Sequence, residues 1–443
     1  MKIALILAPS FPKAYPLLGL GCLNAVLRKA GHEVRIFDFA ATLEFEHSGG
    51  EAFWHDPEFV AGYRGRHPEF FDGMCRALSS YAPDLAGFSV WQSNAPASRL
   101  VCEGLKKLRP GVFTVFGGPE AGFRPENFIS DGFLDALVRG EGETALLRLA
   151  AGETSVPPPG VLLNKGSVVL DGGPAALVPD LDALPFPDFA GFPLDSYSTR
   201  LMPLHFNRGC VHRCAFCNVA ATWQAGCRLR SPQSLHAEML NANRLYGAEI
   251  FQACSPAVNA DHARLARLCE LLLEGGKKFI WNGSAFFSDA LTPELCAKMG
   301  RAGVQVLDFG LESASPKVLR LMGKAFSPET ARRNIRDCHA AGIRVFLNIV
   351  VGFPGETAED LQLTKDFLLE NRAFIDRIGP PSECVAARGS LLDEQPERYG
   401  LDPSPHKRLS NWEMADGSST HALRLAQVEE FRRWAADNGL FWS

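Results

Sequence analysis

Short apolar runs alternate with amphipathic segments along most of the chain. In residues 1–150 each apolar run has the length of a strand, and a segment with helical spacing or a glycine-rich turn follows it. Such alternation predicts a parallel sheet with helices packed on both faces. The sequence therefore predicts an α/β fold that begins with a doubly wound, Rossmann-like domain. Its expected strands are residues 2–7, 34–39, 84–89, 112–116 and 134–138.

The pattern changes between residues 151 and 198. This segment contains three consecutive prolines at 157–159 and a proline-punctuated stretch at 184–188. Proline clusters of this kind favour irregular connections over helices or strands. We expect a linker here, with one short hairpin near residues 161–170.

Strand–helix alternation resumes at residue 199 and continues to about residue 379. Six consecutive units predict a partial (β/α)6 TIM-like barrel, in which chemistry gathers at the carboxyl ends of the strands. The remainder, residues 380–443, is expected to form a small, mainly helical segment with a final helix over 421–438. The loop 388–420 is expected to contact substrate, or else simply to cap the barrel. The expected barrel strands are 201–206, 249–253, 279–282, 304–309, 344–351 and a sixth near 373–378 or 383–387.

Composition narrows the class of protein. Hydrophobic residues make up 46% and charged residues 21% of the 443 positions, as in ordinary globular proteins. The net charge of −5 argues against a nucleic-acid partner. No apolar run approaches the roughly 18 residues of a membrane span, and the apolar start is interpreted as a buried strand. Twelve cysteines without a pairing pattern indicate a reducing, cytoplasmic location.

Three cysteines stand within eight residues, directly after the first expected barrel strand. Cys210, Cys214 and Cys217 have three and then two residues between them. Three thiolates on one short loop can bind three irons of a cubane iron–sulfur cluster and leave the fourth iron open. Two alternatives stay open. One is a zinc site, for which His212 is poorly placed as the closing ligand, and the other is three unrelated buried cysteines.

This cysteine spacing after the first strand of a (β/α) run resembles the radical S-adenosylmethionine (SAM) superfamily. The order of domains resembles the members that carry an N-terminal cobalamin-binding domain, and the resemblance extends over about residues 1–375. Several motifs in the expected order carry it. They are Pro16-Leu-Leu-Gly-Leu-Gly, Leu27-Arg-Lys-Ala-Gly-His, Gly117-Gly118-Pro119, Arg139-Gly-Glu-Gly-Glu143, Leu184-Pro-Phe-Pro-Asp188, Asn207-Arg-Gly-Cys210, Arg230-Ser-Pro232, Phe309-Gly-Leu-Glu-Ser313 and Val351-Gly-Phe-Pro-Gly-Glu-Thr357.

The resemblance implies that the three cysteines ligate a 4Fe–4S cluster whose open iron binds SAM. Phe216 matches the family's aromatic position beside the adenine, with a core phenylalanine as the alternative. Glu312 and Ser313 match positions that contact the ribose, where a carboxylate accepts hydrogen bonds from both hydroxyls. A helix N-cap pair is the alternative for these two residues. Val350 is expected to flank the adenine by its backbone.

One part of the expected SAM site departs from the family. After the second barrel strand, relatives usually have an acidic residue that meets the amino group of SAM, whereas this chain has Phe251-Gln-Ala-Cys-Ser-Pro256. Gln252 or Ser255 are the candidates to substitute for it. Cys254 either faces the site or is a buried thiol at the end of a strand.

The resemblance also implies a cobalamin site in the first domain. Ser89, Gly117 and Gly118 match the serine and the paired glycines along the dimethylbenzimidazole tail. Trp91 and Gln92 are expected to cover the lower face of the corrin, with a core tryptophan as the alternative for Trp91. No histidine follows the first strand, so cobalamin is expected to bind without a protein ligand to cobalt.

The leading functional hypothesis is a radical SAM enzyme that uses a 4Fe–4S cluster, SAM and cobalamin. It would generate a 5′-deoxyadenosyl radical and methylate an unactivated carbon through methylcobalamin. Its expected partners are a small electron donor of flavodoxin or ferredoxin type and a small-molecule or peptide substrate. One alternative is a radical SAM cyclase or rearrangement enzyme, with or without cobalamin. The other is a non-enzymatic cobalamin- or cluster-dependent sensor.

Overall fold

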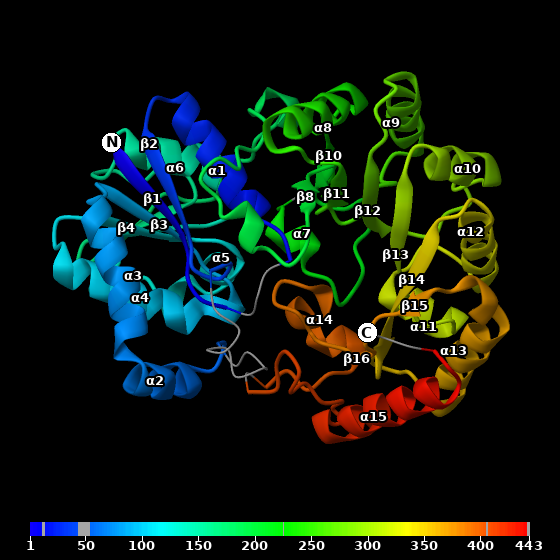
Figure 1. The fold of residues 1–443 in the computed structure, drawn as a ribbon. Helices are drawn as coiled ribbons and strands as arrows, with labels where there is room; N and C mark the ends of the chain where they lie inside the picture. The colour runs from blue at the N-terminus through cyan, green and yellow to red at the C-terminus, as the bar shows by residue number, and fades with distance from the viewer. Residues whose placement is uncertain (11–13, 43–53, 225, 405, 441–443) are drawn as a thin grey trace. The chain divides into compact units, whose positions relative to one another are not determined.

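The computed structural model describes residues 1–10, 14–42, 54–224, 226–404 and 406–440. The chain divides into two compact units, Met1–Pro203 and Leu204–Ser443 (Figure 1). Among the described residues, none of the helices combines the length and the apolar character that crossing a membrane requires.

A seven-stranded sheet, counted over the described residues, forms the centre of the first unit. Its spatial order is β2-β1-β3-β4-β5-β6-β7, with the first five strands parallel and the last two antiparallel. This confirms the predicted doubly wound domain, and the apolar start of the chain is its buried strand β1. The strands are β1 (Lys2–Leu7), β2 (Glu33–Asp38), β3 (Leu85–Ser89), β4 (Phe113–Gly117), β5 (Ala136–Val138), β6 (Val161–Asn164) and β7 (Val169–Asp171).

Helices cover both faces of this sheet. On one face α3 (Pro68–Tyr81) packs against α4 (Ala95–Leu108), and elsewhere α1 (Leu18–Lys29) packs against α6 (Gly142–Ala150). Strand β1 lies between β2 and β3, so the chain winds away from it in both directions. The carboxyl ends of β1 and β3 therefore flank a topological switch point, where sheets of this kind bind ligands.

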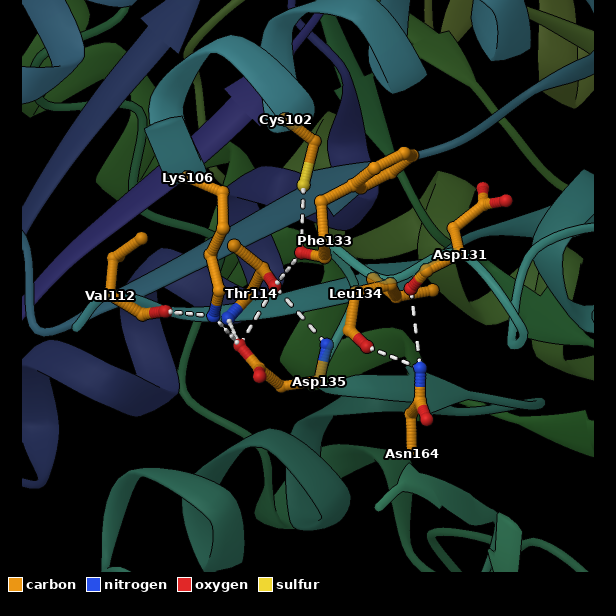
Figure 2. Close-up of polar contacts among 9 residues, drawn as sticks. All are labelled: Cys102, Lys106, Val112, Thr114, Asp131, Phe133, Leu134, Asp135 and Asn164. Carbon is orange, nitrogen blue, oxygen red and sulfur yellow. Dashed lines mark hydrogen bonds and ion pairs between the residues drawn. The ribbon is translucent and has the colours of Figure 1, made fainter. Parts of the chain in front are cut away.

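A polar network ties together the opposite end of the sheet, at the start of β4 and β5 (Figure 2). Asp135 accepts hydrogen bonds from Lys106 Nζ at 2.5 Å and from the Thr114 hydroxyl at 2.9 Å. Asn164, at the end of β6, donates to the carbonyl of Leu134 at 3.0 Å. These side chains satisfy hydrogen-bond donors and acceptors where three strands begin or end. We therefore infer that the network stabilises the sheet.

Residues 151–198, which the sequence analysis assigned to a linker, lie in the first compact unit. The hairpin expected near 161–170 is confirmed as β6 and β7, and it extends the sheet. Farther along, Asn24 donates to the Asp188 carbonyl at 2.9 Å and the Tyr197 hydroxyl donates to Asp38 at 2.7 Å. These contacts hold the proline-rich segment against the first unit.

The second unit contains a sheet in which each strand from β8 to β15 pairs with the next strand of the same sheet, and the pairs from β11 onward are parallel. Its order is β15-β14-β13-β12-β11-β8, with β16 also paired to β14. Sequential parallel pairing confirms the predicted partial barrel. Both regions proposed for the sixth strand prove to be short strands. The strands are β8 (Leu201–Leu204), β11 (Ile250–Ala253), β12 (Ile280–Ala285), β13 (Val304–Glu312), β14 (Arg344–Val351), β15 (Arg377–Ile378) and β16 (Ser382–Glu383).

Helices cover the outer side of this sheet (Figure 1). Each one begins after a Ser, Thr or Asp whose side chain accepts a backbone N–H of the first turn, which satisfies a donor that the helix itself leaves open. The sequence thus marks where each helix starts. The helices are α8 (Pro232–Tyr246), α9 (His262–Glu274), α10 (Pro293–Arg301), α12 (Pro328–Ala340) and α13 (Ala358–Asn371).

The C-terminal segment completes the second unit. It contains the short helix α14 (Leu391–Glu394) and the expected final helix, α15 (His421–Asp437). Trp412 is buried, and its indole N–H donates to the Cys384 carbonyl at 2.7 Å. Both residues belong to an apolar cluster that also contains Ala215 of the cysteine loop and Phe353 after β14. The segment therefore packs beside the carboxyl ends of the barrel strands.

Candidate cluster and cofactor sites

The cysteine loop follows β8 and the short strand β9 (Asn207–Arg208), which pairs with β10 (Arg228–Leu229). Gly209 has a φ of +86°, and a Cβ there would overlap the Gly226 carbonyl. The loop can therefore turn away from β9 only at a glycine.

Two other elements hold the loop at Ala215, between the second and third cysteines. The Ala215 N–H donates to the carbonyl of Met322, at the end of α11 (Pro316–Met322), at 2.8 Å. The Ala215 carbonyl accepts the N–H of Leu392 in α14 at 3.0 Å. Because both bonds join backbone groups, they fix the loop whatever the neighbouring side chains do.

The three thiols lie close enough to affect one another's ionisation, and all three are free of disulfides. Burial raises the pKa of Cys214 and of Cys217, and the charge of Cys210 raises both further. Three thiolates together thus need compensating positive charge, which iron ions supply. No three His, Cys, Asp or Glu side chains of the described residues converge enough to hold a single metal ion, whereas cluster thiolates each bind a different iron. The loop fits a cluster.

Two further residues lie near the thiols: His212 lies within the cysteine loop, and Cys227 lies next to it. His212 packs its ring edge-on against Phe286, with centroids 4.4 Å apart, and burial lowers the pKa of this histidine. Cys227 accepts a hydrogen bond from Asn207 at 3.3 Å, and the charge of Cys210 helps to raise the pKa of Cys227. Sequence analysis did not single out Cys227, because only the pairing of β9 with β10 brings it near the loop.

Glu312 stands at the end of β13, where the strand is irregular. The register with β14 shifts between Gly310 and Glu312, and Glu312 has a φ of +62°. The Lys324 ammonium donates to the Glu312 carboxylate at 3.1 Å and to the Gly310 carbonyl at 2.9 Å. It also lies 5.7 Å from the centre of the Phe216 ring. The structure thus joins two predicted SAM-site residues, Glu312 and Phe216, through a lysine.

Lys324 is a functional candidate that sequence analysis missed. Burial lowers its pKa, but the negative charges of Glu312 and Cys214 outweigh burial and raise the pKa overall. The lysine therefore remains a cation beside the cysteine loop. A Cβ on Gly310 would overlap the Glu312 carboxylate and lie 3.0 Å from Lys324 Nζ. A larger residue at position 310 would therefore displace the ion pair. A lysine just after a helix-ending glycine gives no signal in the sequence that it will be buried.

The other two expected SAM-site residues have different surroundings. Ser313 is fully buried, and its hydroxyl lies 3.2 Å from that of Thr364 and accepts the Ser315 N–H. The helix N-cap proposed as the alternative for 312–313 is in fact Ser315, which caps α11. Val350 is half-buried and packs against the same apolar cluster as Phe216.

The stretch that lacks the family's acidic residue has a structural role at one position. The Ser255 hydroxyl accepts the N–H groups of Phe206 at 2.7 Å and of Asn207 at 3.2 Å. Ser255 therefore holds the chain that leads into the cysteine loop. The Gln252 side-chain amide donates a long hydrogen bond, 3.4 Å, to the carbonyl of Ala253, and Cys254 is half-buried directly after β11.

Glu356, within the motif after β14, also lies at this end of the barrel. It accepts the Gly352 N–H at 2.6 Å, while its second carboxylate oxygen is buried and has no hydrogen-bond partner in the described part of the chain. Burial raises the pKa of Glu356 to about 7. The sequence used this residue only as a marker of the family, because its burial depends on the packing of the segment that follows.

The five residues proposed for cobalamin meet at the carboxyl ends of β3 and β4. Ser89 and Gly117 are register partners, and the Trp91 indole N–H donates to the Ser89 hydroxyl at 3.3 Å. Gly118 has a φ of +96°, and a Cβ there would lie 2.8 Å from the Val90 carbonyl. Such a position admits only glycine without strain.

Trp91 is 36% exposed, so it is not a core residue. The neighbouring Gln92 is exposed as well. Asn94, which the sequence analysis missed, accepts the Trp91 N–H at 2.8 Å and donates to the Ser89 carbonyl at 3.1 Å. An exposed indole, a hydroxyl and close backbone at the carboxyl ends of β3 and β4, beside the switch point, fit a large, amide-bearing ligand such as a corrinoid.

These features define a class of protein: a corrinoid-type doubly wound domain joined to a barrel that carries a three-cysteine cluster loop. Residues 5–150 match the family model described as B12 binding domain, and residues 204–368 match the Radical SAM superfamily. The barrel region therefore matches the radical SAM superfamily and the first domain matches B12-binding domains, as the resemblance in the sequence led us to expect. This agrees with the expected cofactors, which are a 4Fe–4S cluster, SAM and cobalamin, and with an enzyme rather than a sensor.

Individual proteins resemble the chain over most of its length. An uncharacterized methyltransferase of Pyrococcus horikoshii is 24% identical over 83% of this chain and 77% of its own. The cytidylyl-2-hydroxyethylphosphonate methyltransferase of Streptomyces wedmorensis is 25% identical over 80% and 73%. The methyltransferase TsrM of Kitasatospora setae, solved with cobalamin and a [4Fe-4S] cluster, has the same fold. Its TM-score is 0.71 at 18% identity, over 91% of this chain and 76% of TsrM.

Proposed function

We propose that the chain is a cobalamin-dependent radical SAM methyltransferase that methylates an unactivated carbon. The observation that carries the proposal is the three-thiol loop, held beside the Glu312–Lys324 ion pair in a chain that also has a B12-binding domain. The methyltransferase names of the two relatives support it. Enzymes of this superfamily need a reductant, and we propose a small flavodoxin- or ferredoxin-type donor. The substrate is a small molecule or a peptide.

The three cysteines would hold the cluster. When bound, the cluster and SAM would supply a radical that removes a hydrogen atom, and cobalamin would supply the methyl group. The protein's own task at this loop is to keep three thiolates in place. The two backbone hydrogen bonds of Ala215 and the turn from the Cys217 N–H to the Cys214 carbonyl, 3.1 Å, do this.

The ion pair beside the loop would position SAM. Glu312 can accept hydrogen bonds from a vicinal diol through the oxygen that Lys324 leaves open. Lys324 forms an ion pair with that carboxylate and offers a positive charge next to the thiolates. Phe216 and Val350, which pack against one apolar cluster, would form the wall for a flat ring such as adenine.

The first unit would hold cobalamin through neutral groups. Trp91 and Gln92 offer exposed surface for the corrin, whereas Ser89 and the two glycines allow close approach of the tail. The stretch after β1 contains no histidine, so none of its side chains would ligate cobalt there.

The test uses protein purified without oxygen and incubated with SAM and a strong reductant. The wild-type chain should show corrinoid bands beside the broad cluster absorption, and it should release 5′-deoxyadenosine. Cys214→Ala should abolish both the cluster absorption and the nucleoside, because one of three irons loses its ligand. Cys22→Ala, a thiol in α1 of the other unit, is the matched control and should behave as the wild type.

Release of 5′-deoxyadenosine by Cys214→Ala at the wild-type rate would contradict the cluster assignment. The same assay separates the proposal from its alternative, a radical cyclase or rearrangement enzyme without cobalamin. That enzyme would release the nucleoside and show no corrinoid bands, even after reconstitution with cobalamin.

A further inference from the structure

The inner face of the partial barrel is polar and open to solvent. Successive strand residues point to opposite faces, and the outward positions, such as Trp281, Leu307 and Val345, are buried under helices. Seven inward side chains are instead half-buried or exposed, whereas Val306 on the same face is buried. The seven are Gln252, Asn282, Ser284, Asp308, Phe346, Asn348 and Arg377. Closed barrels fill this space with packed apolar side chains, so the inner face here is suited to a ligand.

Four of these residues form one layer across neighbouring strands. Ser284 pairs in register with Asp308, Asp308 with Phe346, and Phe346 with Arg377. Parallel strands lie about 4.8 Å apart, so an acid and a guanidinium face the same space with one aromatic ring between them. The Arg377 guanidinium lies 5.3 Å from the centre of that ring.

The two charged side chains of this layer interact electrostatically but do not form an ion pair. Burial raises the pKa of Asp308, and the charge of Arg377 lowers it. Yet neither side chain has a hydrogen bond or an ion pair within the part of the chain that the structure describes. One layer away, the side-chain amide oxygen of Asn282 is buried and has no hydrogen-bond partner among the described residues. Partly buried polar groups without partners are costly in a protein and call for an explanation.

We propose that this layer binds a zwitterionic group of the substrate, with an ammonium at Asp308 and a carboxylate at Arg377. An apolar ligand would leave both charges unpaired, and a ligand with one charge would leave the other unpaired. A group with both charges satisfies the layer, as an amino acid does. Asn282 and Asn348 then offer further hydrogen bonds to the same molecule.

The position along β13 agrees with this assignment. Asp308 precedes Glu312 by four residues, which corresponds to about 13 Å along a strand. The inference rests on the proposed function in one respect, because Glu312 marks the place where SAM would bind. A substrate held at Asp308 by its charged end would extend its remaining carbons toward that place. The substrate class that follows is an amino acid or a terminal residue with free amino and carboxylate groups.

The test measures binding without turnover. The 443-residue chain, without reductant, is mixed with L-phenylalanine, its methyl ester or N-acetylphenylalanine, and binding is followed by saturation-transfer NMR titration. The ester lacks the carboxylate and the acetyl derivative lacks the ammonium. The variants are Asp308→Asn and Arg377→Gln. Arg301→Gln, an exposed arginine at the end of α10, is the control for net charge.

In the wild type, L-phenylalanine should bind about tenfold or more tightly than either derivative, because each derivative loses one charged hydrogen bond. Arg377→Gln should bind the amino acid and its ester alike, and Asp308→Asn should bind the amino acid and its acetyl derivative alike. Arg301→Gln should discriminate as the wild type does. Melting temperatures close to that of the wild type show that the variants fold.

The inference is wrong if the wild type binds none of the three probes, if it binds all three equally, or if both layer variants keep the wild-type discrimination. These outcomes are independent of the chemistry. Failure to release 5′-deoxyadenosine in the cluster assay would contradict the proposed function and leave this binding result unchanged.

Discussion

The two units present different chemistry at the carboxyl ends of their parallel strands. In the first unit, the residues assigned to cobalamin are neutral, and Trp91 and Gln92 among them are exposed. In the second unit, half-buried thiols stand beside the Glu312–Lys324 ion pair, whose side chains are 10% and 13% exposed. Both units place their site where parallel strands end. The first site offers a ligand exposed neutral side chains and close approach to the backbone, whereas the second offers charged side chains.

The difference shows in which substitutions each site should tolerate. A site built from backbone approach is sensitive to an added methyl group and indifferent to pH. A site built from buried charges is sensitive to the loss of one partner, because the other charge is then left buried alone.

The largest effect on stability is expected for Lys324→Met. This change leaves the Glu312 carboxylate without its cation and should lower the free energy of unfolding by about 3 kcal/mol, measured by urea denaturation. Adding Glu312→Gln should restore most of the loss. Lys107→Met, which removes the lysine of an exposed ion pair, should cost less than about 1 kcal/mol. A double variant no more stable than Lys324→Met would show that the ion pair is not what the lysine stabilises.

The first unit should respond to methyl groups instead. Gly118→Ala places a Cβ 2.8 Å from the Val90 carbonyl at a φ of +96° and should cost about 2 kcal/mol in the urea assay. Gly117→Ala meets nothing closer than 3.8 Å and should cost less than about 1 kcal/mol. Equal losses of unfolding free energy in Gly118→Ala and Gly117→Ala would show that backbone strain at Gly118 is not the cause.

The second unit should also show a pH-dependent stability from Glu356. Its pKa of about 7 in the folded protein exceeds the ordinary 4.5, so the folded state binds the proton more tightly than the unfolded state. The stability gained from the protonated carboxyl is full below about pH 4.5 and is lost as the pH rises through 7. The loss amounts to about 3 kcal/mol. Glu356→Gln should remove this dependence, whereas Glu126→Gln, an exposed carboxylate of the first unit, should keep it. An unchanged pH profile for Glu356→Gln would contradict the assignment.

The smallest effect on stability is expected for Trp91→Ala, because the indole is largely at the surface. The free energy of unfolding should change by less than about 0.5 kcal/mol, while cobalamin affinity should fall about tenfold through the lost ring contact. Absorbance titration with cobalamin measures the second quantity. Unchanged affinity would exclude Trp91 from the corrinoid site.

Much of the fold was predictable because strands and helices alternate with clear periods. The exception is the end of the barrel, where β15 and β16 have two residues each, too few to show a period. The site was predictable where spacing along the chain carries the chemistry, as in the cysteine loop. It was not predictable where packing decides: Lys324 becomes buried only when it meets Glu312, and Ser313 is drawn into a network with Thr364.

The central claim is that one chain holds two groups by two independent sites, one in each unit. Iron and corrinoid content per chain, measured together in three proteins, tests it most directly. The wild type should contain both, Cys214→Ala should lose iron and keep corrinoid, and the double variant Trp91→Ala with Gly118→Ala should lose corrinoid and keep iron. Loss of corrinoid in Cys214→Ala, or full corrinoid in the double variant, would contradict the account.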